Sequence, residues 1–297
     1  MVGQINTLTG VHFAIAKARA YGELLKFRLS FLVAFSCAFG YVLASPDVNW
    51  LSLVMIFLGG FLLSGSSVII NQIIEKDLDR LMTRTMNRPL PTQRVSVNEA
   101  ITEAALCMAI GTGILLIYSN VLTTSLAIIS MILYGFVYTP LKRVGPIAVF
   151  VGAIPGALPP LLGWTAATGA ISHEALIIFG IQFIWQFPHF WAIAWVADED
   201  YKKAGFKLLP SGGQKDMNTA IQIMIYTMFL IPMGLLPATF GITGINSAIV
   251  ATFCGVIFFA LTFSLMKSGD RKSALKIMFG SFLYLPIVQI AYLLDKV

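Results

Sequence analysis

Three oxygen-bearing side chains recur at every fourth residue near position 75. Asn71, Glu75 and Asp79 are spaced i, i+4 and i+8, so a helix would keep them within about 80° of one face. Amide and carboxylate oxygens suit a hard cation such as Mg²⁺, whose remaining ligands are usually water and substrate phosphate. The spacing therefore indicates a divalent-cation site, with a solvated helix end of mixed charge as the alternative interpretation.

Basic residues follow this acidic segment directly. Arg80, Arg84 and Arg88 again stand at i, i+4 and i+8, which predicts a row on one helix face. Arginine binds phosphate through two parallel hydrogen bonds. Membrane anchoring on the cytoplasmic side would explain the arginines but not the acids beside them. Together the two groups fit a diphosphate bridged by a metal ion.

A second acidic cluster lies much later in the chain. Asp198, Glu199 and Asp200 are followed by Lys202 and Lys203. If this cluster faces the first one, two carboxylate sets could hold two Mg²⁺ ions and neutralise a leaving diphosphate.

Two further groups carry chemistry. Tyr138 and Lys142 are spaced i, i+4, so Lys142 could contact phosphate while Tyr138 donates a hydrogen bond, although tyrosine and lysine are also ordinary residues of a membrane interface. His189 follows Trp185 inside an apolar run. An imidazole there is a functional candidate that could bind a metal or a porphyrin carboxylate or accept a proton. The alternative is a histidine whose hydrogen bonds a neighbouring helix satisfies.

The elements that position these residues are predicted to be membrane helices. Of the 297 residues, 57% are hydrophobic and 11% are charged, against about 25% charged in soluble domains. A span needs about 20 mainly apolar residues. The sequence predicts an all-α polytopic bundle of nine transmembrane helices, in one domain covering 1–297, with a kink at Pro155, Pro159 and Pro160. The runs are 24–44, 51–74, 98–118, 121–140, 144–165, 173–196, 218–239, 245–266 and 274–294.

The basic residues set the orientation. With nine spans, every one of the 20 lysines and arginines except Lys296 falls on one side, which predicts a cytoplasmic N-terminus and an external C-terminus. The two longest links, 75–97 and 197–217, then lie on the cytoplasmic side and contain both acidic clusters. Residues 1–20 are expected to form a cytoplasmic surface segment, with an amphipathic helix at 11–21 and no cleavable signal peptide.

The motifs also resemble a known family. The segments 71–90, 138–143, 185–191 and 198–210 resemble the heme O synthases (protoheme IX farnesyltransferases), a branch of the UbiA superfamily of intramembrane prenyltransferases. The resemblance runs from about Tyr21 to the C-terminus. One departure concerns Glu75, where the superfamily usually has Asp. Its carboxylate still offers two oxygens, on a stem one methylene longer.

The resemblance implies a reaction and its participants. The farnesyl group of farnesyl diphosphate would be transferred to a vinyl group of protoheme IX with addition of water, giving heme O and diphosphate. Mg²⁺ would be the cofactor, with Tyr138 assisting and with His189 and Trp185 contacting heme. The implied metal ligands are Asn71, Glu75, Asp79, Asp198 and Asp200, and the implied diphosphate contacts are Arg80, Arg84, Arg88, Lys142, Arg143 and Lys202.

The same resemblance implies a setting and leaves alternatives. The expected location is the inner (cytoplasmic) membrane of a cell, in contact with membrane lipid. A heme A synthase or a terminal oxidase assembly is the expected protein partner, and no nucleic acid is expected. The alternatives are a UbiA-type prenyltransferase with a quinone-precursor acceptor, a transporter, or a heme-binding chaperone without catalysis. A transporter would place ionisable groups near the middle of the membrane, whereas the acids here lie at one face.

Overall fold

The computed structural model describes residues 10–297. Within this part of the chain, nine helices are long and apolar enough to cross a membrane, which confirms the predicted all-α polytopic architecture. They are α2 (Phe27–Ala44), α3 (Trp50–Asp79), α4 (Val97–Tyr118), α5 with its continuation (Val121–Leu141), α7 (Ile147–Thr168), α8 (His173–Val196), α10 (Met217–Thr239), α11 (Ile245–Ser268) and α12 (Arg271–Leu294).

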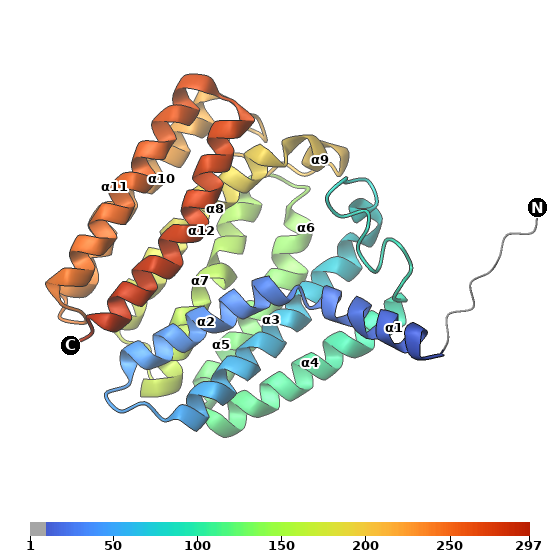
Figure 1. Ribbon diagram of the computed structural model, residues 1–297, viewed down its shortest axis with the longest axis horizontal. Coiled ribbons are helices and arrows are strands. Elements are labelled where there is room, and N and C mark those ends of the chain that lie inside the picture. Colours follow the sequence, from blue (N-terminus) through green and yellow to red (C-terminus); the bar gives the residue numbers. More distant parts are fainter. Residues whose placement is uncertain (1–9) are drawn as a thin grey trace, which may run out of the picture.

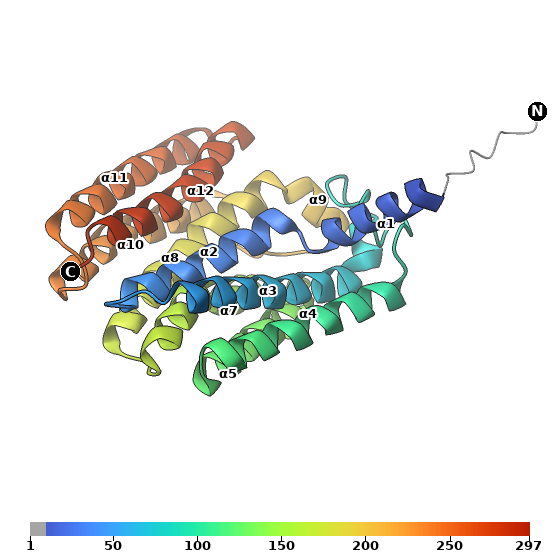
Figure 2. The same cartoon turned by 60° about the horizontal axis from the view of Figure 1, so that its bottom comes forward.

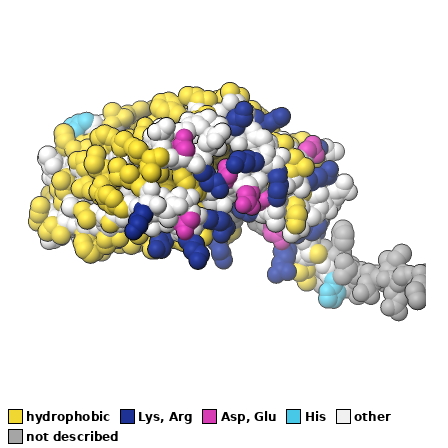
Figure 3. All heavy atoms as spheres, turned by 90° about the horizontal axis from the view of Figure 1, so that it is seen from above, with side chains coloured by type: hydrophobic (Ala, Val, Ile, Leu, Met, Phe, Trp, Pro, Cys, Tyr) yellow, Lys and Arg dark blue, Asp and Glu magenta, His cyan; other side chains and the backbone are white. Residues whose placement is uncertain are grey.

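Local sequence explains where these helices begin. Side-chain oxygens of Asn49, Ser96, Asn120 and Ser172 each accept a hydrogen bond from a backbone N–H in the first turn of the following helix. Such caps satisfy donors that have no partner within the helix. Beyond the caps, apolar side chains face outward along the bundle, and charged side chains gather on one part of the face seen in Figure 3, beside an apolar part. This division is what a bilayer requires of a spanning bundle.

Six of the helices surround a central space. α2 packs against α3, α7 and α12, α7 packs against α5 and α8, and α8 packs against α12 (Figures 1 and 2). The others lie outside this ring, with α4 along α3 and with α10 and α11 beside α8 and α12. The short helix α9 (Asp198–Lys203) follows α8 at one end of the bundle.

The crossing of α2 and α7 depends on two glycines. A Cβ atom at Gly163 would overlap the backbone carbonyl of Cys37, and one at Gly40 would overlap the carbonyl of Pro160. Small residues allow helix backbones to approach this closely in membranes. The prolines predicted to kink this span do not end it, because α7 runs unbroken from Ile147 to Thr168.

The predicted N-terminal helix is present as α1 (Gly10–Leu24). It docks at the start of α4, where Lys17 forms an ion pair with Glu99 at 2.8 Å and the Tyr21 hydroxyl donates to the same carboxylate at 3.0 Å. Ala20 and Leu24 are buried on its inner face. The rest of the expected surface segment, residues 1–9, lies outside the described residues.

Candidate active site

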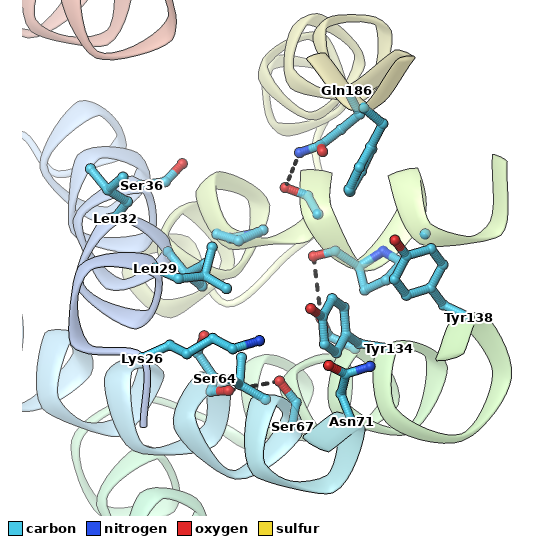
Figure 4. A pocket seen from close by; sticks show the side chains of 18 of the residues that line it. Lys26, Leu29, Leu32, Ser36, Ser64, Ser67, Asn71, Tyr134, Tyr138 and Gln186 are labelled. Atoms are coloured by element: carbon cyan, nitrogen blue, oxygen red, sulfur yellow. Dashed lines mark hydrogen bonds between the residues drawn. The ribbon is translucent and has the colours of Figure 1, made fainter. Parts of the chain in front are cut away.

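The ring of helices encloses a cavity of about 510 Å³. Side chains of α2, α3, α5, α7, α8 and α12 line it, and its walls are mostly apolar. Charged side chains are concentrated at the end formed by the last turns of α3 and the loop that follows. Figure 4 shows part of the lining, with Lys26, Asn71, Tyr134, Tyr138 and Gln186 around one space.

The first predicted motif lies on one continuous helix that lines this cavity. α3 extends through Asp79, so the i, i+4, i+8 spacing holds across the whole motif. Asn71, Glu75 and Asp79 are 2%, 4% and 0% exposed and all border the cavity. The Asn71 amide nitrogen donates to the Thr139 hydroxyl at 3.0 Å, so the amide oxygen takes no part in that bond. The structure therefore brings the three oxygens to one wall.

Each buried carboxylate has a basic partner. Glu75 lies 2.8 Å from the Lys142 amine, and Asp79 lies 2.6 Å from the Arg88 guanidinium. The second oxygen of Asp79, Oδ1, is buried without a hydrogen-bond partner among residues 10–297. An unpartnered carboxylate oxygen is costly, and a hard cation would satisfy it. The donor set of Asn71, Glu75 and Asp79 thus fits Mg²⁺.

Tyr138 and Lys142 reach this wall through an irregular helix. Residues Leu133–Tyr138 form a π-helix, η1, followed by α6 (Thr139–Leu141). Such segments are rare and frequent at functional sites, and here Pro140 contributes no backbone N–H to a regular ladder. The Lys142 amine sits 4.9 Å from the centre of the Tyr138 ring. Both side chains border the cavity.

The predicted row of arginines on one helix face is wrong. α3 ends at Asp79, whose carbonyl accepts a hydrogen bond from the Thr85 hydroxyl at 2.9 Å, and the chain continues in turns. Helical spacing therefore does not apply beyond Asp79. Arg84 and Arg88 border the cavity, whereas Arg80 lies outside its lining and donates to the Pro91 carbonyl at 3.3 Å.

The second acidic cluster does not face the first across the cavity. Asp198 lies 2.9 Å from the Lys202 amine and 3.2 Å from that of Lys215. Asp200 accepts hydrogen bonds from the backbone N–H groups of Thr83 at 3.1 Å and Arg84 at 3.0 Å. Neither aspartate lines the cavity. Within residues 10–297, no three Asp, Glu, His or Cys side chains are grouped to hold a metal by themselves.

Asp200 instead fixes the loop that carries Arg84. Burial raises the pKa of this carboxyl, but the N–H groups of Arg84 and Thr83 and the Lys203 amine outweigh burial and lower the pKa to about 2. The carboxylate form is thus the one that binds the loop. Two other predicted phosphate contacts lie outside the cavity lining: Arg143 is exposed, and Lys202 pairs with Asp198.

His189 and Trp185 both border the cavity from α8. Their rings stack with centroids 4.3 Å apart. Trp185 donates to the Ser281 carbonyl at 3.0 Å, and His189 Nδ1 lies 2.9 Å from the Ser281 hydroxyl. That hydroxyl donates its proton to the Met278 carbonyl at 2.6 Å, so Nδ1 must be the donor to Ser281. The Nε2 atom of neutral His189 therefore carries a lone pair.

Sequence reasoning missed Lys26. This residue joins α1 to α2 with a left-handed backbone (φ 45°), which non-glycine residues adopt rarely. Its side chain enters the cavity from α2, as Figure 4 shows. Burial and the nearby cations of Arg88 and Lys142 lower the pKa of its amine well below the usual value. In the sequence it is one basic residue among many before a span, which is not a distinguishing signal.

Sequence reasoning also missed the glutamines. Gln182, Gln186 and Gln289 are buried within spans and border the cavity. Here a signal was available, because polar amides are rare in apolar runs and face the bundle interior.

The fold and the cavity define a polytopic membrane protein with an acidic and basic wall at one end of an apolar chamber. A model of the UbiA prenyltransferase family matches residues 33–285, so the chain belongs to this family. This confirms the resemblance found in the motifs.

Individual relatives agree with this assignment. The chain is 54% identical over 280 residues to a protein from Cytophaga hutchinsonii named protoheme IX farnesyltransferase, covering 94% of this chain and 98% of that one. It is 44% identical to a protein of the same name from Christiangramia forsetii, covering 93% of each.

Solved structures share the fold. A structure of digeranylgeranylglyceryl phosphate synthase superposes with a TM-score of 0.77 at 21% identity, covering 94% of this chain and 98% of that one. A UbiA homolog from Archaeoglobus fulgidus bound to GPP and Mg²⁺ superposes with a TM-score of 0.67 at 16% identity, covering 92% and 99%.

Proposed function

We propose that this protein transfers the farnesyl group of farnesyl diphosphate to a vinyl group of protoheme IX, with addition of water, to give heme O and diphosphate. The observation that carries the proposal is the 54% identity, along nearly the whole chain, to a relative named protoheme IX farnesyltransferase. The cavity supports it, because an apolar chamber with a charged wall suits an apolar chain that ends in a diphosphate.

We further propose that Asn71, Glu75 and Asp79 hold Mg²⁺. The unpartnered Oδ1 of Asp79 supports this assignment, as does the Mg²⁺ bound to the Archaeoglobus homolog. When bound, the metal neutralises charge on the diphosphate and makes it a better leaving group. The ion pairs with Lys142 and Arg88 hold the acids in place until substrate arrives.

The diphosphate contacts in this proposal are Lys26, Arg84, Arg88 and Lys142, which all border the cavity. Charge builds up on the diphosphate as the allylic C–O bond breaks, and preorganised cations stabilise that charge. Tyr138 assists as a hydrogen-bond donor. The vinyl electron pair then attacks the allylic carbon. The apolar walls keep bulk water away until the new carbon–carbon bond has formed.

The remaining predicted residues take other roles. We assign Asp200 to positioning the loop of Arg84 rather than to direct metal binding, because its oxygens accept the backbone N–H groups of Thr83 and Arg84. We assign Asp198 to the ion pairs with Lys202 and Lys215. Arg80 and Arg143 receive no contact with substrate. His189 and Trp185 contact the porphyrin through their stacked rings.

We also propose the setting. The protein spans the inner membrane as one catalytic domain, with its N-terminus cytoplasmic and its C-terminus external. The distribution of lysine and arginine supports this orientation. The exception, Lys296, is bound by local structure, because its amine donates to the carbonyls of Val42 at 2.9 Å and Ser45 at 2.5 Å. A heme A synthase or a terminal oxidase assembly is the proposed partner, as recipient of the product.

The test is turnover by purified protein in detergent with protoheme, farnesyl diphosphate and Mg²⁺, followed by mass spectrometry. A product heavier than heme by one farnesyl group and one hydroxyl group, absent after chelation and restored by Mg²⁺, is expected. Prenylation of a hydroxybenzoate instead of heme would replace the acceptor in this proposal. Heme binding without turnover on either acceptor would reject catalysis.

A further inference from the structure

A cluster of buried amides and one hydroxyl lies where α2, α8 and α12 meet. Gln289 donates through Nε2 to the Ser36 hydroxyl and to Gln182 Oε1, both at 2.9 Å. The Ser36 hydroxyl donates to Gln182 Oε1 at 2.9 Å. Since all three residues border the cavity, this cluster makes part of its wall polar although it lies within the membrane spans.

Gln186 lies one turn from Gln182 along α8 and faces α7. Its Nε2 donates to the Gly156 carbonyl at 2.9 Å, and Gln182 Nε2 donates to the same carbonyl at 2.8 Å. A Cβ atom at Gly156 would come within 2.7 Å of this amide nitrogen, so the glycine leaves room for the side chain. These contacts fix the amide plane of Gln186.

The amide oxygen of Gln186 remains as an acceptor without a protein donor. Gln186 Oε1 receives no hydrogen bond from the part of the chain that the structure describes, although the residue is only 5% exposed. Gln186 projects from α8 toward the same space as Tyr134 and Tyr138 (Figure 4). Because Gln186 borders the cavity and Oε1 is not among the fully buried unpartnered atoms, this oxygen is open to the cavity. A polar cavity wall with enough room holds water.

The depth of Gln186 matches that of Asn71, the innermost residue of the first motif. Gln186 lies ten residues before the end of α8 at Val196, and Asn71 lies eight residues before the end of α3 at Asp79. At about 1.5 Å per residue, both lie roughly 12–15 Å from the ends of their helices. Gln289 lies near the opposite end of α12, close to Leu294, and is therefore farther from the diphosphate.

We propose that Gln186 Oε1 holds the water molecule that hydrates the carbocation, an inference that rests on the proposed function. Attack by the vinyl electron pair forms the bond to the allylic carbon and leaves a cation on the vinyl carbon next to the porphyrin ring. The water held by Gln186 donates an electron pair to this carbon and forms the new C–O bond. Its proton passes to the Nε2 lone pair of His189, three residues along α8.

Ser281 supports this last step. It accepts the Nδ1 proton of His189 while its own proton is bound by the Met278 carbonyl, so the tautomer with a free Nε2 is the one favoured. Without a held water, the cation loses a proton instead, and the product is an alkene lighter than heme O by one water.

The experiment compares Gln186→Met with wild type in turnover with ¹⁸O-labelled water, and mass spectrometry measures the ratio of hydrated to dehydrated product. We expect the ratio to fall by about tenfold in Gln186→Met, the factor that loss of one hydrogen bond produces. Gln289→Met is the matched control, since it removes an equally buried cavity amide, and its ratio should equal that of wild type. If Gln186→Met does not accumulate, Gln186→Asn, with its amide drawn back by one methylene, gives the same readout.

Each result has one meaning. A wild-type ratio in a turning-over Gln186 variant overturns the assignment of the water while leaving farnesyl transfer intact. Equal losses in Gln186→Met and Gln289→Met also overturn it, because they indicate a general disturbance of the cavity. A wild-type protein that forms neither product contradicts the proposed function itself.

Discussion

The carboxylate of Asp79 lies 2.6 Å from the guanidinium of Arg88, nine residues further along the chain. One residue ends α3 and the other lies in the turns after it. Both border the same cavity. The ion pair therefore holds the α3–α4 loop against the end of the cavity. It also places the proposed metal ligand, Asp79, beside a proposed diphosphate contact, Arg88.

Replacing Asp79 should remove activity without unfolding the protein. Asp79→Asn keeps the shape of the side chain but removes the charge that binds metal, and we expect turnover to fall at least about 100-fold, the loss typical of one removed electrostatic contact. Turnover and gel-filtration profile are the measurements. Asp77→Asn, with a side chain 72% exposed on the same helix, is the control and should behave as wild type. Full activity in Asp79→Asn would contradict the proposed metal site.

Arg84 and Arg80 should differ in their effect on substrate binding. Arg84 borders the cavity, whereas Arg80 contacts Pro91 on the outside. We expect Arg84→Gln to raise the KM for farnesyl diphosphate by about tenfold, the effect of losing one charge-assisted hydrogen bond, and Arg80→Gln to stay within about twofold of wild type. Steady-state kinetics with varied farnesyl diphosphate measure both. Similar values for the two variants would contradict the placement of the loop.

Glu75 and Lys142 should be coupled in their contributions to the free energy of unfolding. Lys142→Met leaves the Glu75 carboxylate buried without its partner at 2.8 Å, at a cost of about 3–5 kcal/mol. The double variant Glu75→Gln with Lys142→Met removes both charges and should recover most of that loss. The coupling free energy is measured by denaturant unfolding in detergent. The proteins compared are the wild type, both single variants and the double variant. Additive effects would show that the pair is not coupled.

Asp200 should make the order of the α3–α4 loop depend on pH. Its pKa is lowered from 3.8 to about 2 in the folded state, chiefly by the N–H groups of Arg84 and Thr83 acting against burial. A lowered carboxyl pKa stabilises the folded form fully above the unfolded value, and the stabilisation disappears as pH falls from 3.8 toward 2. Hydrogen exchange at Thr83 and Arg84 should therefore show stable protection above pH 4 and a loss of protection below it.

The matched control for this pH dependence is Asp200→Asn. This variant keeps the shape of the side chain without a titrating group, so exchange at the two amides should be faster at neutral pH and should lack the change between pH 4 and 2. A persistent change in the variant would assign the effect to another carboxyl.

The α2–α7 crossing should tolerate no added methyl group. Gly163→Ala would place a Cβ atom against the Cys37 carbonyl, so we expect a loss of about 1–3 kcal/mol through overpacking. Gly113→Ala on α4, where nothing lies within 4 Å of the new atom, should be neutral or stabilising, since alanine is the better helix former. Thermal unfolding in detergent compares the two. Equal stability would contradict the close approach of the two backbones.

The nine spans and the composition of the first motif were predictable from the amino-acid sequence alone. Apolar runs of about 20 residues have one stable form in lipid, because a helix satisfies its own backbone. The motif at Asn71, Glu75 and Asp79 was predictable for a related reason: helical spacing is a local property, and α3 continues unbroken through Asp79.

Which charged residues reach the cavity depends on the packing of the folded chain. Arg80 and Arg84 look equivalent in sequence, but the chain leaves the helix after Asp79, and only Arg84 borders the cavity. Asp200 resembles a metal ligand, yet its oxygens are bound to backbone amides of a loop more than a hundred residues earlier. Such contacts depend on how helices distant in sequence pack together, and local spacing carries no information about that packing.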